Sequence, residues 1–487
     1  MNAKDINNLE PKQLWQNFAK LCEIPRPSHH EEKISAFMKN FGKELGLETH
    51  VNKLGNVIIK KSATAGMENR KTVVLQAHLD MVPEKNNDIQ HDFTKDPIEA
   101  YIDGDVVTAK GTTLGADDGI GVATIMTILQ SKDIKHGPIE ALFTINEEDG
   151  MDGAFAVKPD ELNGEILLNL DSELEGEINI ACAGGIYTNA TIPYTTETSP
   201  SNAQAYQIIV TGLSGGHSGI DIHLERGNAI KIMNQLLWEA NNTCDIRVAN
   251  FDGGSAPNAI PREAHATIIV AKKDQDKFLK FIDEFTKTIK NELAKKDDNL
   301  TIQTSNSSMP EKVFTKESLE KICKAIYTCP NGVFTMSADI PGLTETSTNI
   351  GIIKTTDKNI EIYTLQRSST ESLKEKIAEM VTIALESTGG TAKRAGSYPA
   401  WQPNTESEIL KLAEKIYKKL FNKEVKVTAM HAGLEPAILG HTFPNWDMIS
   451  IGPTLRFVHS PDEKAEIATV DKFWKFLLEI LLEIPKK

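Results

Sequence analysis

The pattern of apolar and polar residues changes along the chain, and its first part predicts an α/β domain. Runs such as TVVLQ and EILLNL are apolar without alternation, as expected for strands that helices cover on both faces. An apolar helix is expected at 119–131, between two of these strands, and amphipathic helices over about 10–46. The predicted strands lie at 56–61, 72–80, 139–148 and 165–171. This alternation indicates a mainly parallel sheet.

The helical pattern near the start of the chain is interrupted at IPRPS, residues 24–28. Ser28 followed by Glu31 matches a capping box, so we expect Ser28 to cap the second helix. The opening residues, MNAKDINNLEPKQLW, lack the apolar core and the small-residue cleavage site of a signal peptide. The chain is therefore expected to carry no secretion signal.

A different pattern begins near 184–194, where the sequence predicts half-exposed strands together with long amphipathic helices. Residues 255–285 and 346–380 share a loop–strand–helix order, which predicts an internal duplication of one α+β module. After Trp401 the pattern of helix and buried strand returns. We therefore expect an α+β domain inserted within the α/β domain. The expected parts are 1–185 and 398–487 for the α/β domain and 186–397 for the inserted domain.

Composition and charge narrow the classes of partner. With 487 residues, the chain exceeds the size at which single cores stop growing, so more than one domain is expected. The 53 Lys and Arg against 68 Asp and Glu give a net charge of −15, which disfavours nucleic acid and membrane surfaces. The 5 cysteines are scattered without Cys-x-x-Cys pairs, so a disulfide framework and a thiolate zinc site are not expected. These features indicate a cytoplasmic protein.

Acidic and histidine side chains follow the predicted strands one after another. Ligands bind outside the carboxyl ends of strands in an open α/β sheet, so these side chains are expected to converge. Taken singly, a strand-terminal Asp is usually a turn or helix cap. Several carboxylates at one sheet edge repel one another, however, and divalent cations are their natural countercharge. The residues concerned are His78, Asp80, Asp117, Asp118, Glu147, Glu148, Asp171 and, far downstream, His459.

Sequence blocks from about residue 24 to 463 carry a resemblance to a known family. They are IPRPSHHEE, LQAHLDMVPEKN, GTTLGADDGIG, INEEDGMDGA, LNLDSE, GGHSGIDIHLERGNA, SAPNAIPREA, HAGLEPA and HSPDE. Together they resemble the co-catalytic metallopeptidases typified by aminoacylase and glutamate carboxypeptidase. Within that family they are similar to the branch that hydrolyses dipeptides, including Xaa-His dipeptides such as β-alanyl-histidine. One departure is Asp118, where many relatives have Asn or Lys.

The resemblance implies a zinc-peptidase-like catalytic domain with an inserted α+β lid domain, and it implies a role for each strand-end residue. His78 would ligate a metal ion, and Asp80 would orient its ring through the other nitrogen. Asp117 would bridge two divalent ions, with Zn²⁺ expected first and Co²⁺ or Mn²⁺ as competitors. Glu147 would be the general base that takes a proton from the attacking water. The remaining implied ligands are Glu148 and Asp171, which would complete the site of one ion, and His459, which would complete the other site beside His78.

Substrate contacts follow from the same resemblance. His217 in GGHSG would stabilise the oxyanion of the tetrahedral intermediate. Asn258 and Arg367 would hold the substrate's carbonyl and terminal carboxylate, which an Arg fork suits. Gly433 and Glu435 are placed to meet the free amino end, although a glycine turn before a helix is an equal alternative.

Two further enzyme activities and one other class of protein stay open. The same metal core would suit an aminotripeptidase or an N-acyl amino-acid hydrolase. A non-catalytic binder of metal or peptide is the different-class alternative, but a binder has no need of a general base such as Glu147. The expected partner is a small peptide substrate. The identity of the metal, the preferred dipeptide and the choice between a monomer and a homodimer are not fixed by the sequence.

Overall fold

The computed structural model describes residues 6–338 and 340–487, so residues 1–5 of the opening segment lie outside it. The chain divides into two compact units, each with its own hydrophobic core. The first unit runs to Ala181 and resumes over Trp401–Ala429 and Leu434–Lys487. The second comprises Cys182–Ala400 and Met430–Gly433. The sequence pattern did not indicate that this last short segment joins the second unit.

The first unit is built on an eight-stranded sheet in the order β1-β2-β6-β3-β7-β23-β8-β22. Its strands are β1 (Glu48–Val51), β2 (Val57–Lys61), β3 (Val73–His78), β6 (Ile139–Thr144), β7 (Ile166–Asn169), β8 (Glu177–Cys182), β22 (Lys426–Met430) and β23 (Asp447–Ser450). Strands β6, β3, β7 and β23 are parallel neighbours. The pairs β1–β2, β2–β6 and β23–β8 are antiparallel. The sheet is therefore mixed, and the parallel arrangement expected of it is confined to the centre.

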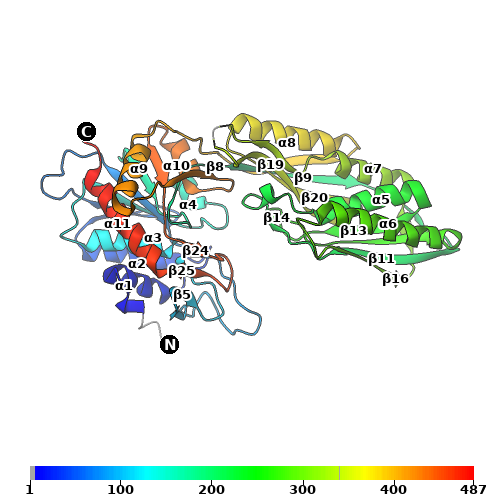
Figure 1. Ribbon diagram of the computed structural model, residues 1–487, viewed down its shortest axis with the longest axis horizontal. Helices are drawn as coiled ribbons and strands as arrows, with labels where there is room; N and C mark the ends of the chain where they lie inside the picture. The colour runs from blue at the N-terminus through cyan, green and yellow to red at the C-terminus, as the bar shows by residue number, and fades with distance from the viewer. Residues whose placement is uncertain (1–5, 339) are drawn as a thin grey trace. The chain divides into compact units, whose positions relative to one another are not determined.

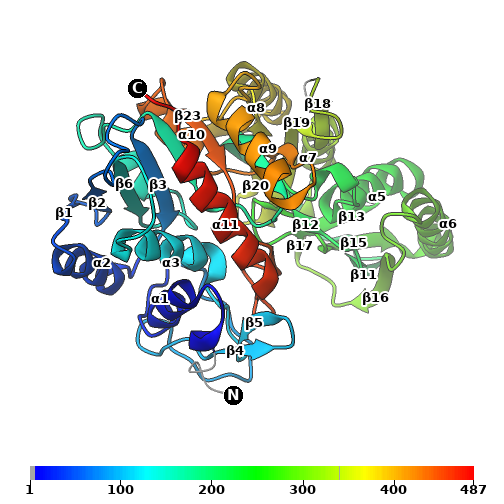
Figure 2. The same ribbon diagram turned by 60° about the vertical axis from the view of Figure 1, so that its left-hand side comes forward.

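Helices and a small sheet complete this unit. They are η1 (Ile6–Asn8), α1 (Lys12–Cys22), α2 (Glu32–Glu44), α3 (Ala116–Gln130), α4 (Asp152–Ala156), α9 (Glu408–Phe421), α10 (Glu435–Thr442) and α11 (Ile467–Glu483), with β4 (Ala100–Asp103), β5 (Val106–Ala109), β24 (Leu455–Arg456) and β25 (Lys464–Glu466). Every residue of α3 from Ala116 to Leu129 is buried, because α3 packs against β3 and α1 (Figure 2). The run of apolar residues that predicted this helix is thus explained by burial on all sides.

The expected capping box at the start of α2 is wrong. Helix α2 begins at Glu32 with Glu31 as its N-cap, and no side chain caps it. The Ser28 hydroxyl instead donates a hydrogen bond of 2.8 Å to Asp80 Oδ2. The Ser28 hydroxyl binds the buried carboxylate of Asp80 and not the N-terminus of α2. A tertiary contact therefore overrides the local preference for a helix cap.

The second unit is a nine-stranded antiparallel sheet with four helices along one face (Figure 1). The order is β16-β11-β15-β13-β19-β20-β9-β21, with β18 also paired to β19. The strands are β9 (Gly184–Pro193), β11 (Ala203–Thr211), β13 (Arg247–Gly253), β15 (Ala264–Ala271), β16 (Thr301–Ser307), β18 (Gly332–Met336), β19 (Thr344–Thr355), β20 (Asn359–Ser368) and β21 (Thr391–Tyr398). The helices are α5 (Ala229–Cys244), α6 (Gln275–Leu293), α7 (Lys316–Thr328) and α8 (Glu371–Glu386). Minor elements are β10 (Thr196–Thr198), β12 (Gly216–His217), β14 (Ala259–Ile260), β17 (Lys312–Phe314), η2 (Ile222–Leu224) and η3 (Lys272–Asp274).

The two halves of this sheet share a strand-then-helix order. Strand β15 is followed by α6, and β20 is followed by α8. The halves meet where β13 pairs with β19 at Gly253 and Ile353. The segments compared in the sequence differ before that point, since β14 has two residues and β19 has twelve. The duplication stays a prediction.

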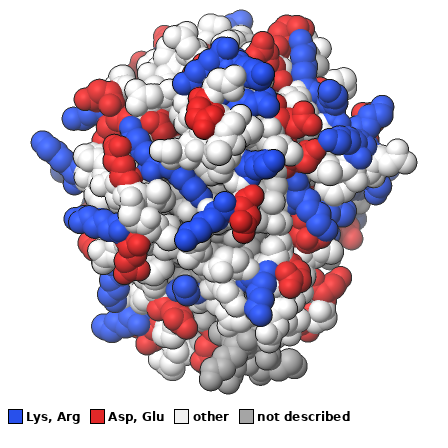
Figure 3. Space-filling view, turned by 90° about the vertical axis from the view of Figure 1, so that its left-hand side faces the viewer, with Lys and Arg blue, Asp and Glu red and all other residues white. Residues whose placement is uncertain are grey.

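Charged side chains of both signs are interspersed over the face of the first unit that Figure 3 shows. The excess of acidic residues in the composition is therefore not gathered into one patch on that face. Across the described residues, no helix has the length and apolar character that crossing a membrane requires. All five cysteines are buried.

Candidate active site

The strand-end residues of the first unit come together at the carboxyl edge of its parallel strands. His78 is the last residue of β3, and its register partner on β6 is Thr144. Asp171 follows β7 by two residues. Glu147 and Glu148 follow β6, so three neighbouring parallel strands deliver their acidic or histidine side chains to one edge.

The His78 ring is held between carboxylates on both sides. Its Nε2 lies 3.1 Å from Asp117 Oδ1 and 3.4 Å from Asp171 Oδ1. Its Nδ1 lies 3.4 Å from Asp80 Oδ1 on the opposite side. The side chains of His78 and Asp80 are almost completely buried, at 1% and 0% exposed. The ring thus presents Nε2 to the acidic cluster while Asp80 fixes its orientation.

Asp117 lies between the two histidines. Its Oδ1 faces His78 Nε2, and its Oδ2 faces His459 Nε2 at 3.2 Å. His459 Nε2 also lies 2.9 Å from Glu148 Oε2. Asp117 belongs to the first turn of α3, where the backbone at Asp117 and Asp118 is not helical and the peptide joining them is cis. One carboxylate therefore reaches two histidines that are 381 positions apart in the sequence.

Asp80 also fixes the pair of glutamates. Its Oδ1 accepts a hydrogen bond of 3.0 Å from the Glu147 backbone N–H, and its Oδ2 accepts one of 3.2 Å from Glu148. Ser28 donates to the same Oδ2. The Asp80 carboxylate thus links the end of β3 to the turn after β6. The sequence patterns did not point to Ser28 in this role, since its spacing matched a helix cap.

Asp118, the neighbour of Asp117, is also buried. Its Oδ1 accepts a hydrogen bond of 3.1 Å from the Gly121 backbone N–H in the first turn of α3. Burial raises the pKa of Asp118 well above its usual value. The residue that departs from the family pattern therefore binds the backbone in the first turn of α3 through one of its carboxylate oxygens.

The electrostatics of this site call for a positive charge. Burial raises the pKa values of Asp171 and Glu147 well above their usual range, and the charges of neighbouring carboxylates raise them further. Burial also raises the pKa of Glu148, whose Oε1 has no hydrogen-bond partner among the described residues. Ligand atoms of His78, Asp117 and Glu148 all lie within 4.8 Å of one another. Two imidazoles with three buried carboxylates form a donor set that suits a divalent metal such as zinc.

A second cluster lies in the other unit and centres on His217. The His217 Nδ1 accepts backbone N–H groups from Gly219 and Ile220, at 3.3 and 3.0 Å. Because Nδ1 accepts, the network assigns the ring proton of the neutral imidazole to Nε2. The GGHSG sequence allows this turn, since a Cβ at Gly219 would lie 2.1 Å from the His431 carbonyl oxygen.

Arg367 faces His217 from the end of β20. Its Nη2 lies 3.3 Å from His217 Nε2, and its Nη1 donates a hydrogen bond of 2.8 Å to Tyr398 Oη. Arg367 is only 4% exposed, and its Nε has no hydrogen-bond partner among the described residues. Two N–H donors thus face each other, an arrangement that an oxygen acceptor between them would stabilise. Tyr398 lies in a Gly-rich segment that the sequence patterns marked only as a boundary.

Asn258 lies beside His217 through backbone pairing. Its carbonyl accepts a hydrogen bond of 2.8 Å from the Ser218 N–H, and its neighbour Ala259 pairs with His217. The buried Asn349 side chain on β19 donates to the carbonyls on either side of Asn258. Asn258 itself is exposed, and these hydrogen bonds hold its backbone in place.

Gly433 and Glu435 lie on opposite sides of the boundary between the units. Glu435 is fully buried, and its Oε2 accepts hydrogen bonds from Gln76 Nε2 and Thr144 Oγ1 beneath the strand ends. Burial raises the pKa of Glu435 to about 7. The segment of Gly433 also contains His431, whose Nε2 lies 2.8 Å from Ser347 Oγ and whose burial lowers its pKa to about 3. A contact of Gly433 or Glu435 with substrate stays a prediction.

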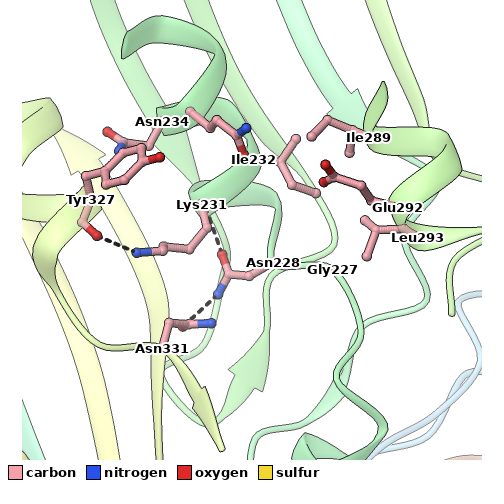
Figure 4. A pocket seen from close by; sticks show the side chains of 11 residues that line it. Gly227, Asn228, Lys231, Ile232, Asn234, Ile289, Glu292, Leu293, Tyr327 and Asn331 are labelled. Atoms are coloured by element: carbon pink, nitrogen blue, oxygen red, sulfur yellow. Dashed lines mark hydrogen bonds between the residues drawn. The ribbon is translucent and has the colours of Figure 1, made fainter. Parts of the chain in front are cut away.

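A pocket of about 340 Å³ in the second unit contains none of the expected site residues (Figure 4). Two charged groups, Lys231 and Glu292, line it. Lys231 donates to the carbonyls of Ile326, Tyr327 and Cys329 at the end of α7. An ammonium has three protons, so these bonds occupy all of them. Asn228 is likewise engaged, as the N-cap of α5. Lys231 and Asn228 thus stabilise the fold of this unit.

Comparison with known proteins assigns the chain to a family. The model of the family described as "Peptidase family M20/M25/M40" matches residues 74–483, and the chain belongs to that family. It is therefore a peptidase and a hydrolase, and the match spans both units.

Similar proteins cover the whole chain. A protein named cytosol non-specific dipeptidase, from Escherichia coli, is 43% identical over 483 residues, which span 99% of this chain and 100% of that protein. The crystal structure of an aminoacylhistidine dipeptidase from Vibrio alginolyticus is 44% identical, with a TM-score of 0.87 and coverage of 99% and 98%. An aminopeptidase from Bacillus cereus is 16% identical, with a TM-score of 0.58 and coverage of 98% and 99%, and shares the fold. The expected α/β metallopeptidase fold and family are confirmed.

Proposed function

We propose that this protein is a metal-dependent dipeptidase that hydrolyses dipeptides with a free C-terminus, including Xaa-His dipeptides. The observation that carries the proposal is the Asp117 carboxylate, whose two oxygens face His78 and His459 beside the Glu147–Glu148 pair. The full-length similarity to proteins named as dipeptidases supports this choice of substrate. The activity is proposed for the cytoplasm, as the name of the Escherichia coli relative suggests.

Two divalent ions, Zn²⁺ in the first place, are the proposed cofactors. His78 and Asp171 would hold one ion, His459 and Glu148 the other, and Asp117 would be shared by both. Each Asp117 oxygen faces a different histidine, while Asp171 lies 3.4 Å from His78 and Glu148 lies 2.9 Å from His459. These distances support a division in which Asp171 and Glu148 bind different ions, whereas the resemblance placed them at one. Such ions supply Lewis-acid polarisation of the scissile carbonyl and lower the pKa of water.

Glu147 is the proposed general base. It would take a proton from the attacking water and later deliver it to the leaving amine. Its backbone N–H is held by Asp80, so the direction in which the side chain leaves the backbone is fixed. Burial raises the pKa of Glu147, which makes its carboxylate a stronger acceptor of a proton. Asp80 would keep the His78 ring oriented throughout the reaction.

The second unit is proposed to supply the contacts with substrate. His217 Nε2–H would stabilise the oxyanion, while Arg367 would bind the terminal carboxylate with Asn258 assisting at the carbonyl. The two facing donors of His217 and Arg367 support an anionic oxygen as their partner. For the free amino end, the proposed acceptor is Glu435, whose Oε1 has no hydrogen-bond partner among the described residues.

Competing activities can be separated by one substrate panel. The metal-loaded protein is assayed on Gly-Gly, Ala-His, β-alanyl-His, Ala-Ala-Ala and N-acetyl-Ala, with release of free amino acid as the readout. The proposal predicts the highest kcat/KM on the dipeptides. A higher kcat/KM on the tripeptide would favour an aminotripeptidase, and one on the acylated amino acid would favour an N-acyl amino-acid hydrolase. If none of the substrates were hydrolysed, the remaining alternative would be a non-catalytic binder of metal or peptide.

A further inference from the structure

We propose that Glu463 is a positioning residue of the metal centre, because its carboxylate binds the backbone of the loop that carries Asp117. The inference rests on the proposed function, since it concerns the residues that would hold the metal ions. Glu463 is the last residue of the HSPDE block, in which only His459 was given a role.

Four successive backbone N–H groups converge on this one carboxylate. Glu463 Oε2 accepts from Leu114 at 2.7 Å and from Gly115 at 2.9 Å. Its Oε1 accepts from Ala116 at 2.8 Å and from Asp117 at 3.4 Å. The carboxylate is enclosed, with Glu463 only 2% exposed. These bonds therefore determine the path of the backbone up to the residue that faces both histidines.

A buried arginine, Arg26, binds a backbone carbonyl group of the same loop. Arg26, which is 3% exposed, donates to the carbonyl oxygens of Leu79 and Asp80 at 3.0 and 2.8 Å, and also to that of Gly115. The guanidinium thereby ties the end of β3 to the Asp117 loop. It also supplies the positive charge that a buried carboxylate such as Glu463 requires.

The loop approaches Arg26 so closely that glycine is required at Gly115. Its φ of 68° is left-handed, and a Cβ there would lie 2.6 Å from Arg26 Nη2. The GTTLGADDGIG block is thus shaped by the two buried charges as well as by the residues expected to bind metal. This shape is fixed by backbone contacts, which do not depend on the Asp117 side chain itself.

Glu463 and His459 lie on one turn, closed by a hydrogen bond of 3.1 Å from the Glu463 N–H to the Ser460 carbonyl. This turn contacts Asp117 by two routes, through the His459 ring and through the Glu463 carboxylate. If the carboxylate is lost, the Asp117 loop can move relative to both His78 and His459. Because each Asp117 oxygen faces a different histidine, we expect weaker binding at both metal positions.

The test is a comparison of Glu463→Gln with a matched control, Glu140→Gln. Glu140 is also buried, at 3% exposed, and accepts backbone N–H groups from Asn163 and Gly164 at 2.7 and 2.9 Å. It lies at the other end of β6, away from the strand ends that carry the site. Both substitutions remove one carboxylate acceptor from a buried backbone cradle, so their effects on folding should be similar.

The readouts are Co²⁺ affinity, measured by titration of metal-free full-length protein, and the visible absorption spectrum of the Co²⁺-loaded protein. We expect Glu463→Gln to bind Co²⁺ about 10- to 100-fold more weakly, with an altered spectrum. Glu140→Gln should match the wild type in both readouts. Glu463→Asp, which keeps the charge but shortens the reach, is measured in parallel and should lie between wild type and Glu463→Gln.

Wild-type affinity and spectrum in Glu463→Gln, or in Glu463→Asp if the Gln variant does not fold, would overturn the inference. An equal loss of affinity in Glu140→Gln would also overturn it, because the effect would then be one of general stability. If the wild-type protein itself bound no Co²⁺, the proposed function would fail and the inference would fall with it.

Discussion

The two clusters differ in the sign of the charge that they need. In the first unit, buried carboxylates surround two imidazoles, and burial and mutual repulsion raise the pKa values of Asp171, Glu147 and Glu148. In the second, N–H donors of His217 and Arg367 face each other at 3.3 Å. One site is therefore arranged for a cation and the other for an anionic oxygen. The proposed metal ions would meet the first need, and the carboxylate of the proposed peptide substrate would meet the second.

The clusters also differ in how their side chains are fixed. The carboxylates of the first unit are held by strand ends and by backbone N–H groups, as Asp80 holds Glu147 and Glu148. His217 lies instead in a turn that its own ring stabilises through Gly219 and Ile220. Chemistry that must be aligned with a metal ion is thus expected from the first cluster, and recognition from the second. Substitutions should separate these two contributions.

The largest effect is expected from Glu147→Gln. Loss of the proposed general base should lower kcat about 10³-fold, while KM changes little because the substrate contacts remain. The control is Asp149→Asn, which removes an exposed acidic group two residues away. Steady-state hydrolysis of Ala-His, with metal content checked for each variant, measures the effect. Full turnover in Glu147→Gln would contradict the proposed mechanism.

The next effect concerns stability. Buried groups of the two units, Glu435 and His431, should make the free energy of unfolding depend on pH in opposite directions. The pKa of Glu435 is raised to about 7, so the folded state holds its proton longer than the unfolded state does. Its contribution to stability is then lost as the pH rises from about 4.5 to 7, by about 3 kcal/mol. The pKa of His431 is lowered to about 3, so its contribution is lost as the pH falls from about 6.5 to 3, by about 5 kcal/mol.

Urea unfolding of the metal-free protein between pH 4 and 8 tests this pair. The difference in stability between Glu435→Gln and wild type should increase with pH, and that between His431→Gln and wild type should increase as the pH falls. Each variant is the control for the other, because they lie in different units. Parallel profiles for both variants would show that these buried groups do not titrate as expected.

A smaller effect is expected from Arg367→Lys. Lysine cannot form the planar fork that reaches toward both Tyr398 and His217, so KM for Ala-His should rise about 10- to 100-fold. The same variant should hydrolyse Ala-His amide as well as the wild type does, since that substrate has no carboxylate. Arg394→Lys, on β21 of the same unit, is the matched control. An equal loss on both substrates would place Arg367 outside carboxylate recognition.

The fold and the first cluster were largely predictable from the sequence. Unbroken apolar runs located β3, β6 and β7, and polar residues directly after them located His78, Glu147 and Asp171. Parallel strands bring such positions together whatever their separation in the sequence. The edges of the sheet were less predictable, because strand direction there depends on connections that apolar patterning does not encode.

Residues that act through the backbone were not predictable. Ser28 matched a helix cap but donates to Asp80, and Glu463 binds N–H groups more than 340 positions away. Arg26 and Tyr398 likewise act through partners that are distant in the sequence. No local spacing reports such contacts, since they exist only once the chain is folded.

The most direct test of a metal-dependent dipeptidase follows hydrolysis and metal occupancy together. The full-length protein is stripped with a chelator and titrated with Zn²⁺, and bound metal and Ala-His hydrolysis are measured at each step. We predict that two ions bind per chain and that activity, absent from the stripped protein, returns as they bind. Activity that survived complete removal of metal, or a protein that bound no ion, would contradict the proposal.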